Sequence, residues 1–273
     1  MSFQLRPEGA VVSGRHIFEV RAQTESGEVY DEGYALIDYE HIKRTALYSE
    51  ASATVSVVPV EVRSGVRVGY IMGSGDSGPE AIRQMGAPVE MLDGTRVRDG
   101  DFDGLSTIVL GVRAYETRAD LQSASAQVLD FARSGGTVIV QYNRGTLGSL
   151  APWDLTVGRG SPRVSDETAP VRIIEPDAPI FTSPNRIGDA DFDGWVQERG
   201  LYFASGWDDR YTPLLVLNDP GEEPRFGSML ATEVGDGVFV YTGLSFFRQW
   251  ADQVPGAYRF FANLISLDPK EWR

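Results

Sequence analysis

Polar side chains that could hold a ligand follow two apolar stretches of the sequence. They come directly after residues 107–112 and 137–142 and are Arg113, Tyr115, Arg118, Asn143 and Arg144. Guanidinium, amide and hydroxyl groups in such a position can hold a carboxylate or the hydroxyls of a sugar. An internal ion-pair network with Glu116 or Asp120 accounts for the same arginines, because buried arginines are usually paired. Both interpretations remain open at the level of sequence.

A second group of candidate ligand contacts lies in the aromatic stretch 185–211 and after the last predicted strand. Its members are Asn185, Arg186, Trp195 and Arg248. Aromatic faces flanked by planar polar side chains are surfaces to which sugar rings bind. The competing interpretation is that the aromatic residues form the core of a loop-rich subdomain, because large aromatic side chains are mostly buried. For a ligand site, we expect Asn185, Arg186 or Trp195 to face the two strand ends and Arg248 to close the site.

The sequence lacks the nucleophile and the metal ligands of common hydrolytic mechanisms. It contains no cysteine, and its two histidines are His16 and His41. Without a thiol there is neither a cysteine nucleophile nor a thiolate metal site. We therefore predict no catalytic residue of this kind, no bound metal and no cofactor.

The candidates for acid–base chemistry are four carboxylates, Asp76, Glu116, Asp193 and Glu198. Glycoside hydrolysis needs two such groups that face each other across the scissile bond. The spacing of these four residues in the sequence does not indicate that any two of them form a catalytic pair. An accessible pocket with two of them would favour catalysis, whereas a cleft lined by arginine and aromatic side chains would favour binding.

Two kinds of turn carry weaker ligand signals. Residues 73–78 form a glycine-rich loop before a predicted helix and could cradle an anion, but they lack the lysine of a phosphate-binding loop. We therefore predict an ordinary turn. Residues 99–104 and 189–194 begin like calcium loops, but Leu110 and Gly200 stand at the twelfth position, where such loops have a glutamate.

The elements that must position these residues alternate between strand and helix over residues 63–273. The predicted strands of the sheet are 66–72, 89–92, 107–112 and 137–142. The predicted helices are 79–85, 123–133 and 257–267. A further strand over 213–218 and a hairpin over 228–234 and 238–244 follow from alternating apolar residues and glycine turns. This order predicts a doubly wound, mostly parallel α/β sheet, in which the first four strands lie in the order second, first, third, fourth.

Residues 1–62 have a different pattern, which predicts an all-β segment. Apolar residues alternate over 15–23, 28–39 and 53–62. Three strands are too few to close a sandwich of about seven strands. The segment is therefore an arm packed on the α/β domain or the tail of a β-sandwich, and we favour the sandwich tail.

Charge and hydropathy exclude two classes of partner. The formal net charge of −14 argues against nucleic-acid binding, which requires a cationic face. No apolar run approaches the ~20 residues that a membrane span requires. Residues 1–7 also lack the apolar stretch of a secretion signal.

The end of the fourth predicted strand resembles a known fold family. The order of elements, the step Gly135-Gly136 into a buried strand and the elbow Gln141-Tyr142-Asn143 resemble the class I glutamine amidotransferase-like fold, a flavodoxin-like arrangement. Active members of that family carry a cysteine at this elbow and a histidine and a carboxylate after a late strand. The resemblance therefore implies the fold without the amidotransferase chemistry.

Longer stretches resemble the C-terminal region of large bacterial LmbE/PIG-L-type deacetylases. They are GYIMGSGD (69–76), GVRAYETR (111–118), VQYN (140–143), SPNRIG (183–188), GWVQERGLY (194–202) and YTGLSFFR (241–248). In those proteins a zinc deacetylase domain comes first, β-sandwich material follows and a domain like this one ends the chain. The resemblance implies a periplasmic or secreted location, and the zinc-binding His-Pro-Asp-Asp motif is absent from this sequence.

Together these patterns predict a non-catalytic accessory module of a LmbE/PIG-L-type N-acetyl sugar deacetylase. The module would bind glycan or dock onto the deacetylase domain of a longer chain. The alternative is an independent carbohydrate-active hydrolase that uses Asp, Glu and Arg residues at the carboxyl edge of the sheet.

The missing nucleophile gives a first testable prediction. We expect the purified protein to release no ammonia from glutamine, because no cysteine is present and no histidine follows His41. A coupled glutamate dehydrogenase assay measures this activity. Ammonia release that rises in proportion to the concentration of homogeneous protein would contradict the prediction.

Overall fold

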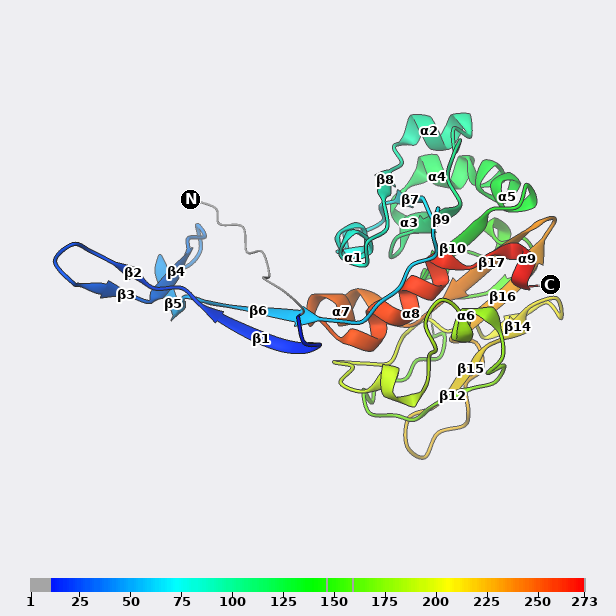
Figure 1. Ribbon diagram of the computed structural model, residues 1–273. Helices are drawn as coiled ribbons and strands as arrows, with labels where there is room; N and C mark the ends of the chain where they lie inside the picture. Colours follow the sequence, from blue (N-terminus) through cyan, green and yellow to red (C-terminus); the bar gives the residue numbers. More distant parts are fainter. Residues whose placement is uncertain (1–10, 146, 159, 273) are drawn as a thin grey trace. The chain divides into compact units, whose positions relative to one another are not determined.

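The computed structural model describes residues 11–145, 147–158 and 160–272 (Figure 1). The chain divides into two compact units, Met1–Pro59 and Val60–Arg273. Of the all-β segment predicted over 1–62, residues 1–10 lie outside the described residues.

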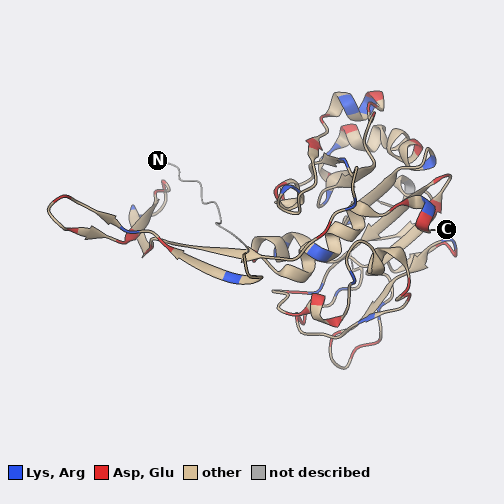
Figure 2. Ribbon diagram, viewed as in Figure 1, with Lys and Arg blue, Asp and Glu red and all other residues tan. Residues whose placement is uncertain are grey.

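Charged residues of both signs are distributed along the chain. Figure 2 shows Lys and Arg residues scattered among Asp and Glu residues. The described part of the chain contains no helix with the length and apolar character that a membrane crossing requires.

The described part of the N-terminal unit is built from antiparallel strand pairs. The pairs are β1 (Gly14–Glu19) with β6 (Ser52–Val57), β2 (Ala22–Gln23) with β3 (Val29–Tyr30), and β4 (Glu32–Ile37) with β5 (Thr45–Glu50). The predicted strands 15–23 and 28–39 are each interrupted, and the pattern does not predict β5. The strand predicted over 53–62 ends at Val57, close to Pro59, which has no backbone N–H to donate.

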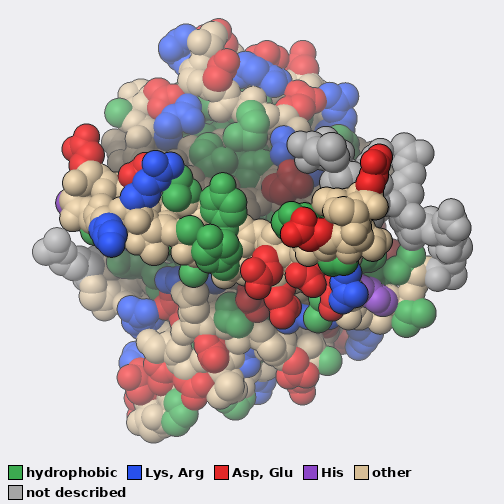
Figure 3. All heavy atoms as spheres, turned by 90° about the vertical axis from the view of Figure 1, so that its left-hand side faces the viewer, with side chains coloured by type: hydrophobic (Ala, Val, Ile, Leu, Met, Phe, Trp, Pro, Cys, Tyr) green, Lys and Arg blue, Asp and Glu red, His purple; other side chains and the backbone are tan. Residues whose placement is uncertain are grey.

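Large apolar side chains of this unit are exposed. Tyr34, Leu47 and Tyr48 are examples, although the rings of Tyr34 and Tyr48 lie 5.9 Å apart across the β4–β5 pair. Figure 3 shows hydrophobic side chains next to acidic ones at the surface. A two-stranded pair has no second layer to cover its faces. None of the described residues 11–59 is therefore buried within the unit.

A seven-stranded sheet of order β14-β16-β17-β10-β9-β7-β8 forms the centre of the α/β unit. Its first four strands in the sequence are β7 (Val68–Ile71), β8 (Val89–Met91), β9 (Thr107–Leu110) and β10 (Thr137–Gln141). These four pair in parallel in the order β8-β7-β9-β10, which confirms the predicted order. The later strands are β14 (Thr212–Pro213), β16 (Met229–Val234) and β17 (Gly237–Thr242). The sheet is mixed, because β17 is parallel to β10 whereas β16 and β14 are antiparallel to their neighbours.

Helices cover both faces of this sheet (Figure 1). Along β10, Ile139 packs in the core with α1 and α8, while Val138 and Val140 pack in the core with α2 and α5. Consecutive side chains of a strand point to opposite faces, so this continuous apolar run is buried on both sides. Three helices match those predicted, namely α1 (Gly78–Gln84), α5 (Ser125–Arg133) and α8 (Pro255–Ser266). The sequence pattern does not predict three further helices, namely α2 (Gly94–Asp99), α3 (Ala114–Thr117) and α4 (Ala119–Ser123).

The C-terminal hairpin matches the prediction, but the strand predicted over 213–218 does not form as one element. Residues Thr212–Pro213 pair with β16, whereas β15 (Leu215–Leu217) pairs with β12 (Val171–Ile173) in a separate small sheet. Pro213 cannot donate to a continuous ladder, so the strand changes partners there. The remaining elements are η1 (Gly148–Leu150), β11 (Leu155–Thr156), α6 (Pro179–Thr182), η2 (Asp189–Phe192), β13 (Gly206–Trp207), α7 (Phe246–Ala251) and α9 (Pro269–Trp272).

The segment that enters the α/β unit is tied to α8. The side chain of Asn185 donates to the carbonyl of Glu61 (2.8 Å) and accepts the Glu61 N–H (2.9 Å). Asn185 is itself held by Asn263 of α8. Two residues further on, Arg63 donates from Nε to the carbonyl of Ser266 at 2.8 Å. Residues 61 and 63 are therefore fixed on the helix before the first strand of the sheet begins.

Gly256 allows α8 to pack against η2, and this contact is testable. A Cβ atom at position 256 would overlap the carbonyl group of Asp191. We predict that Gly256→Ala lowers the free energy of unfolding by about 1–3 kcal/mol, as overpacked cores do, measured by urea denaturation. Gly188→Ala is the control, because a Cβ there meets no atom within 4 Å. Equal stability of the two variants would disprove the packing argument.

Candidate functional site

The candidate site lies at the edge of the sheet where β9, β10 and β17 end. These strands are neighbours and run parallel, so their carboxyl ends meet at one edge. In open α/β sheets this is the edge where ligands bind. Arg113 follows β9, Tyr142 and Arg144 follow β10, and Phe247 and Arg248 follow β17. Residues far apart in the sequence are thus brought to one edge.

Two glycines fix a loop-rich segment on this edge. Gly200 forms an isolated antiparallel bridge with Leu244, directly after β17. A Cβ atom on Gly200 would overlap the carbonyl oxygen of Gly243, and a Cβ atom on Gly243 would lie 2.7 Å from that of Leu201. Only glycine permits such an approach. The contact brings Glu198 and Tyr202, two residues on either side of Gly200, to the ends of the strands.

An aromatic stack forms the centre of the site. The rings of Tyr142 and Tyr202 stack with their centroids 5.4 Å apart and 16° between their planes. The ring of Phe247 lies 5.7 Å from that of Tyr142. The guanidinium of Arg248 lies 5.0 Å from the centroid of Phe247, within cation–π range. Tyr142 is buried, whereas Tyr202 and Phe247 are half-buried and expose part of their surface.

One carboxylate holds two of the predicted arginines. Arg113 and Arg144 each donate from Nε to Oε2 of Glu116 at 3.1 Å. Oε1 of Glu116 accepts the backbone N–H of Arg144. The Glu116 carboxylate raises the pKa of Arg144, and Tyr202 makes a smaller contribution in the same direction. Glu116 therefore orients both guanidiniums, and Arg144 lies next to the aromatic stack.

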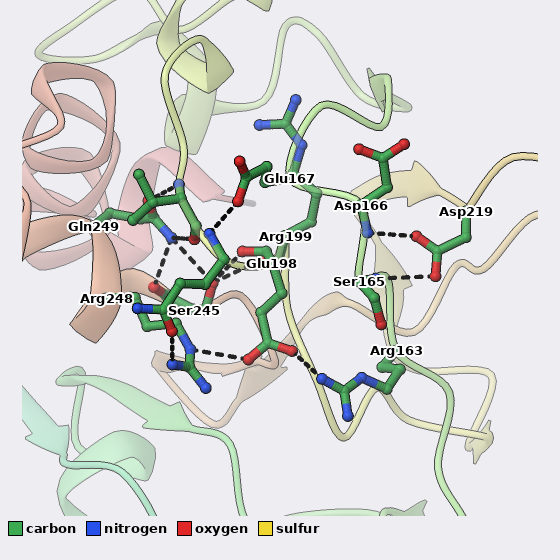
Figure 4. Close-up of polar contacts among 12 residues, drawn as sticks. Arg163, Ser165, Asp166, Glu167, Glu198, Arg199, Asp219, Ser245, Arg248 and Gln249 are labelled. Atoms are coloured by element: carbon green, nitrogen blue, oxygen red, sulfur yellow. Dashed lines mark hydrogen bonds and ion pairs between the residues drawn. The ribbon is translucent and has the colours of Figure 1, made fainter.

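A second carboxylate holds two further arginines (Figure 4). Glu198 accepts Nε of Arg248 at 2.9 Å on Oε1 and Nη2 of Arg163 on Oε2. Arg248 also donates to the side-chain oxygen of Gln197. The Ser245 hydroxyl donates to the Glu198 carbonyl at 2.6 Å. The Glu198 side chain is only 3% exposed, and a charge so buried requires partners of this kind.

The residues bound to Glu116 and those bound to Glu198 meet at the side chain of Tyr142. Burial raises the pKa of Tyr142, the guanidiniums of Arg113 and Arg248 oppose the rise, and Tyr202 and Glu198 add to it. Residues from both groups therefore lie within electrostatic reach of one hydroxyl, which stays protonated and can donate a hydrogen bond. We call these residues the arginine–tyrosine cluster: Arg113, Glu116, Tyr142, Arg144, Arg163, Gln197, Glu198, Tyr202, Phe247 and Arg248.

Three members of the cluster have a left-handed backbone conformation. Their φ angles are 60° for Arg113, 69° for Gln197 and 54° for Tyr202. In residues other than glycine this conformation costs of order 1–3 kcal/mol, and it concentrates where a ligand is bound. Among the described residues, one other non-glycine residue, Gln253, has a positive φ. This concentration of strain distinguishes the cluster from ordinary surface ion pairs.

Two predicted site residues are buried next to the cluster. Asn143 accepts the Tyr115 N–H at 3.1 Å and donates to the Gln141 carbonyl at 2.8 Å. Both Asn143 and Tyr115 are fully buried. The expectation that they contact a ligand is therefore corrected: the Asn143 side chain connects the backbone after β9 with the backbone of β10.

Arg118 is separate from the cluster. It binds Asp120 through Nε at 2.7 Å and Nη2 at 2.5 Å, in the bidentate geometry favoured by arginine and carboxylate. The pair raises the pKa of Arg118 and lowers that of Asp120. The internal ion-pair interpretation therefore accounts for Arg118.

The predicted opposite wall belongs instead to the packing around α8. Asn185 is buried in the contact with the entry segment described above. Trp195 is buried against Phe246 and donates Nε1 to the Asp191 carbonyl at 3.0 Å. Arg186 is exposed. In the described structure none of these three predicted residues has a hydrogen bond or ring contact with a member of the cluster. The positions of Asn185 and Trp195 follow from core formation, which buries most large aromatic side chains.

The glycine-rich loop 73–78 is a turn closed by its own carboxylate. Asp76 accepts the Tyr70 hydroxyl at 2.5 Å and the Gly78 N–H at 2.8 Å on Oδ1. Its Oδ2 accepts the Val112 N–H at 3.0 Å. Burial, followed by the charge of Asp76, raises the pKa of Tyr70 well above its ordinary value. An internal carboxylate thus takes the donors that would cradle an anion.

Three of the four candidate acid–base carboxylates are occupied by internal donors. Both oxygens of Asp76, Glu116 and Glu198 accept hydrogen bonds from the protein, and Asp193 is exposed. In the stretch that resembles a calcium loop, Asp191 pairs with an arginine of α8 at 2.7 Å. The described ranges contain no group of three or more acidic, histidine or cysteine side chains that could hold a metal ion.

The sequence patterns do not single out the aromatic centre or Arg163. Tyr142 has one usable signal, since it follows a strand buried on both faces and so stands at the ligand-binding edge. Tyr202 is one of several aromatic residues in its stretch. Arg163 carries no local signal, because its loop reaches the edge only through the contacts around Gly200.

No protein-family model and no curated protein matches this sequence. Several solved structures are similar in part. A cytoplasmic protein of Salmonella typhimurium is 12% identical with a TM-score of 0.47, covering 86% of this chain and 94% of that one. A ThuA-like protein of Bacteroides uniformis is 10% identical with a TM-score of 0.49, covering 77% and 96%. A cold-adapted β-galactosidase of Rahnella sp. R3 is 14% identical with a TM-score of 0.45, covering 74% of this chain but 31% of the enzyme.

The buried pairing of Glu198 leads to a stability prediction. Glu198→Ala leaves the guanidiniums of Arg163 and Arg248 without their carboxylate. We expect the free energy of unfolding to fall by about 2–3 kcal/mol in urea denaturation. Loss of one partner of a buried pair costs ~3–5 kcal/mol, and the 57% exposure of Arg163 reduces this value.

The matched control is Glu222→Ala, which removes the glutamate of a more exposed pair with Arg225. That variant should stay within about 0.5 kcal/mol of the parent protein. If both variants unfold at the same urea concentration, Glu198 is not the anchor described above.

Proposed function

We propose that the chain is a non-catalytic, glycan-binding accessory module with a class I glutamine amidotransferase-like fold, belonging to a LmbE/PIG-L-type N-acetyl sugar deacetylase. The observation that carries the proposal is the strained arginine–tyrosine cluster at the carboxyl edge of the parallel strands. Strained side chains on a rigid edge are pre-organised, which lowers the cost of binding.

The chemistry of the cluster suits a sugar. Tyr202 and Phe247 offer apolar ring surface for the C–H face of a pyranose. Arg113 uses only Nε in its bond to Glu116, so its Nη groups can donate to hydroxyl or carboxylate oxygens. The protonated hydroxyl of Tyr142 adds another donor. Apolar surface and planar donors thus lie side by side.

The elbow after β10 supports the loss of amidotransferase chemistry. The side chain of Gln141 is buried and donates to the Tyr70 hydroxyl at 3.0 Å. Tyr142 belongs to the stack, and Asn143 holds the neighbouring backbone. None of these three side chains is a nucleophile with a base beside it.

One observation favours the alternative of an independent carbohydrate-active hydrolase. Glu116 and Glu198 belong to the same cluster, as a pair of catalytic carboxylates would. Their oxygens, however, accept hydrogen bonds from guanidiniums and from the backbone N–H of Arg144, and neither carboxylate is left to face a scissile bond. This arrangement supports binding over hydrolysis.

Glycan binding is tested with the hexasaccharides of chitin and of hyaluronan in isothermal titration calorimetry. We expect at least one to bind, and Tyr202→Asn to weaken binding by about tenfold, which corresponds to ~1.4 kcal/mol. Asparagine tolerates the left-handed backbone, so this variant removes the ring without adding strain.

Phe226→Asn is the control, because it removes an exposed aromatic ring that lies outside the cluster. Failure of the folded protein to bind either sugar would refute glycan binding. Shortened oligosaccharides in the mixture, detected by chromatography, would establish the hydrolase instead.

A further inference from the structure

We infer, on the basis of the proposed function, that the sugar bound at the arginine–tyrosine cluster carries a carboxylate, as a uronic acid does. The cluster contains four arginines and two glutamates, so its charge is 4 − 2 = +2. The whole chain has a formal charge of −14. Two glutamates do not neutralise the four guanidiniums within the cluster itself, and an anionic ligand group would complement the remaining positive charge.

The glutamates orient the arginines without consuming their donors. Arg113 and Arg248 each bind their glutamate through Nε. A guanidinium is planar, so a group bound at Nε leaves the fork between Nη1 and Nη2 at the other end. Neither Nη of Arg113 nor Nη2 of Arg248 has a hydrogen-bond partner among the described residues. The fork of Arg113 is therefore open, whereas Arg248 keeps one Nη group because its Nη1 donates to Gln197. A carboxylate is the ligand group that matches an open guanidinium fork.

Nearby acidic residues outside the cluster form no ion pair with its four guanidiniums in the described part of the chain. Glu167 accepts the backbone N–H of Gln197. Glu167, Asp166 and Asp193 act on Arg199, whose side chain is buried outside the cluster. Arg199 donates to two backbone carbonyls rather than to a cluster residue. Arg199 offsets part of the charge of these three carboxylates outside the cluster.

The aromatic stack narrows the ligand class. A simple carboxylate or phosphate ion would use the guanidiniums but not the ring surface of Tyr202 and Phe247. A neutral sugar would use the rings but leave the charge excess unexplained. An acidic sugar uses both in one residue, since its ring carries a C–H face and its C6 carboxylate lies at the ring edge.

The test compares hyaluronan hexasaccharide with its methyl ester, in which the rings and hydroxyls are unchanged and the carboxylates are neutral. We expect the acid to bind at least tenfold more tightly than the ester in calorimetry at 50 mM salt. The preference should shrink at 500 mM salt, where charges are screened beyond a few ångströms. Arg113→Gln should reduce binding of the acid to the level of the ester.

Arg118→Gln is the matched control, because Arg118 follows the same strand but pairs with Asp120 outside the cluster. It should leave the preference unchanged. Thermal unfolding checks that each variant is folded, and Arg144→Gln replaces Arg113→Gln if the latter unfolds. Equal binding of acid and ester overturns the inference while glycan binding stands. Absence of binding to acid, ester and chitin hexasaccharide alike overturns the proposed function, and the inference with it.

Discussion

The close approach of Gly200 to Gly243 is the constraint on which the candidate site depends. The parallel sheet supplies Arg113, Tyr142 and Arg248 at one edge, but Glu198 and Tyr202 come from a segment with little helix or strand. Ordering such a segment costs conformational entropy, and few of its own contacts offset that cost. The backbone bridge to Leu244 and the hydrogen bond from Ser245 fix it to the end of β17. Without that contact the stack of Tyr142 on Tyr202 would lose one of its rings.

The fold could be predicted from the sequence where local pattern and tertiary role coincide. Continuous apolar runs such as 137–142 are buried on both faces of the sheet, so their hydrophobicity and their strand assignment agree. The strand predicted over 213–218 fails because its residues divide between two sheets, which no local pattern records. Likewise, the sequence does not distinguish Arg113 from Arg118, because both follow the same strand. In the structure they differ in their partners: Arg113 binds Glu116 and Arg118 binds Asp120. Trp195 and Asn185 have the residue types of a binding surface, but the packing around α8 buries them.

The cluster shows how two enclosed glutamates can hold four arginines. Glu116 and Glu198 are almost completely enclosed, with 12% and 3% of their side chains exposed, so each acts on the arginines around it rather than on solvent. Each glutamate binds two guanidiniums. The interaction energy of one arginine with its glutamate therefore depends on the other arginine bound to the same glutamate. A ligand that draws Arg113 away from Glu116 also changes the surroundings of Arg144.

The contact of Asn185 with Glu61 has a mechanical consequence. The backbone N–H and carbonyl of Glu61 both form hydrogen bonds with the Asn185 side chain, and Arg63 donates to the carbonyl of Ser266 in the last turn of α8. Tension applied to the polypeptide before residue 60 would reach the hydrogen bonds of Glu61 and Arg63 before it reached β7. The load would be distributed over hydrogen bonds that end on Asn185 and on α8, a helix buried in the core.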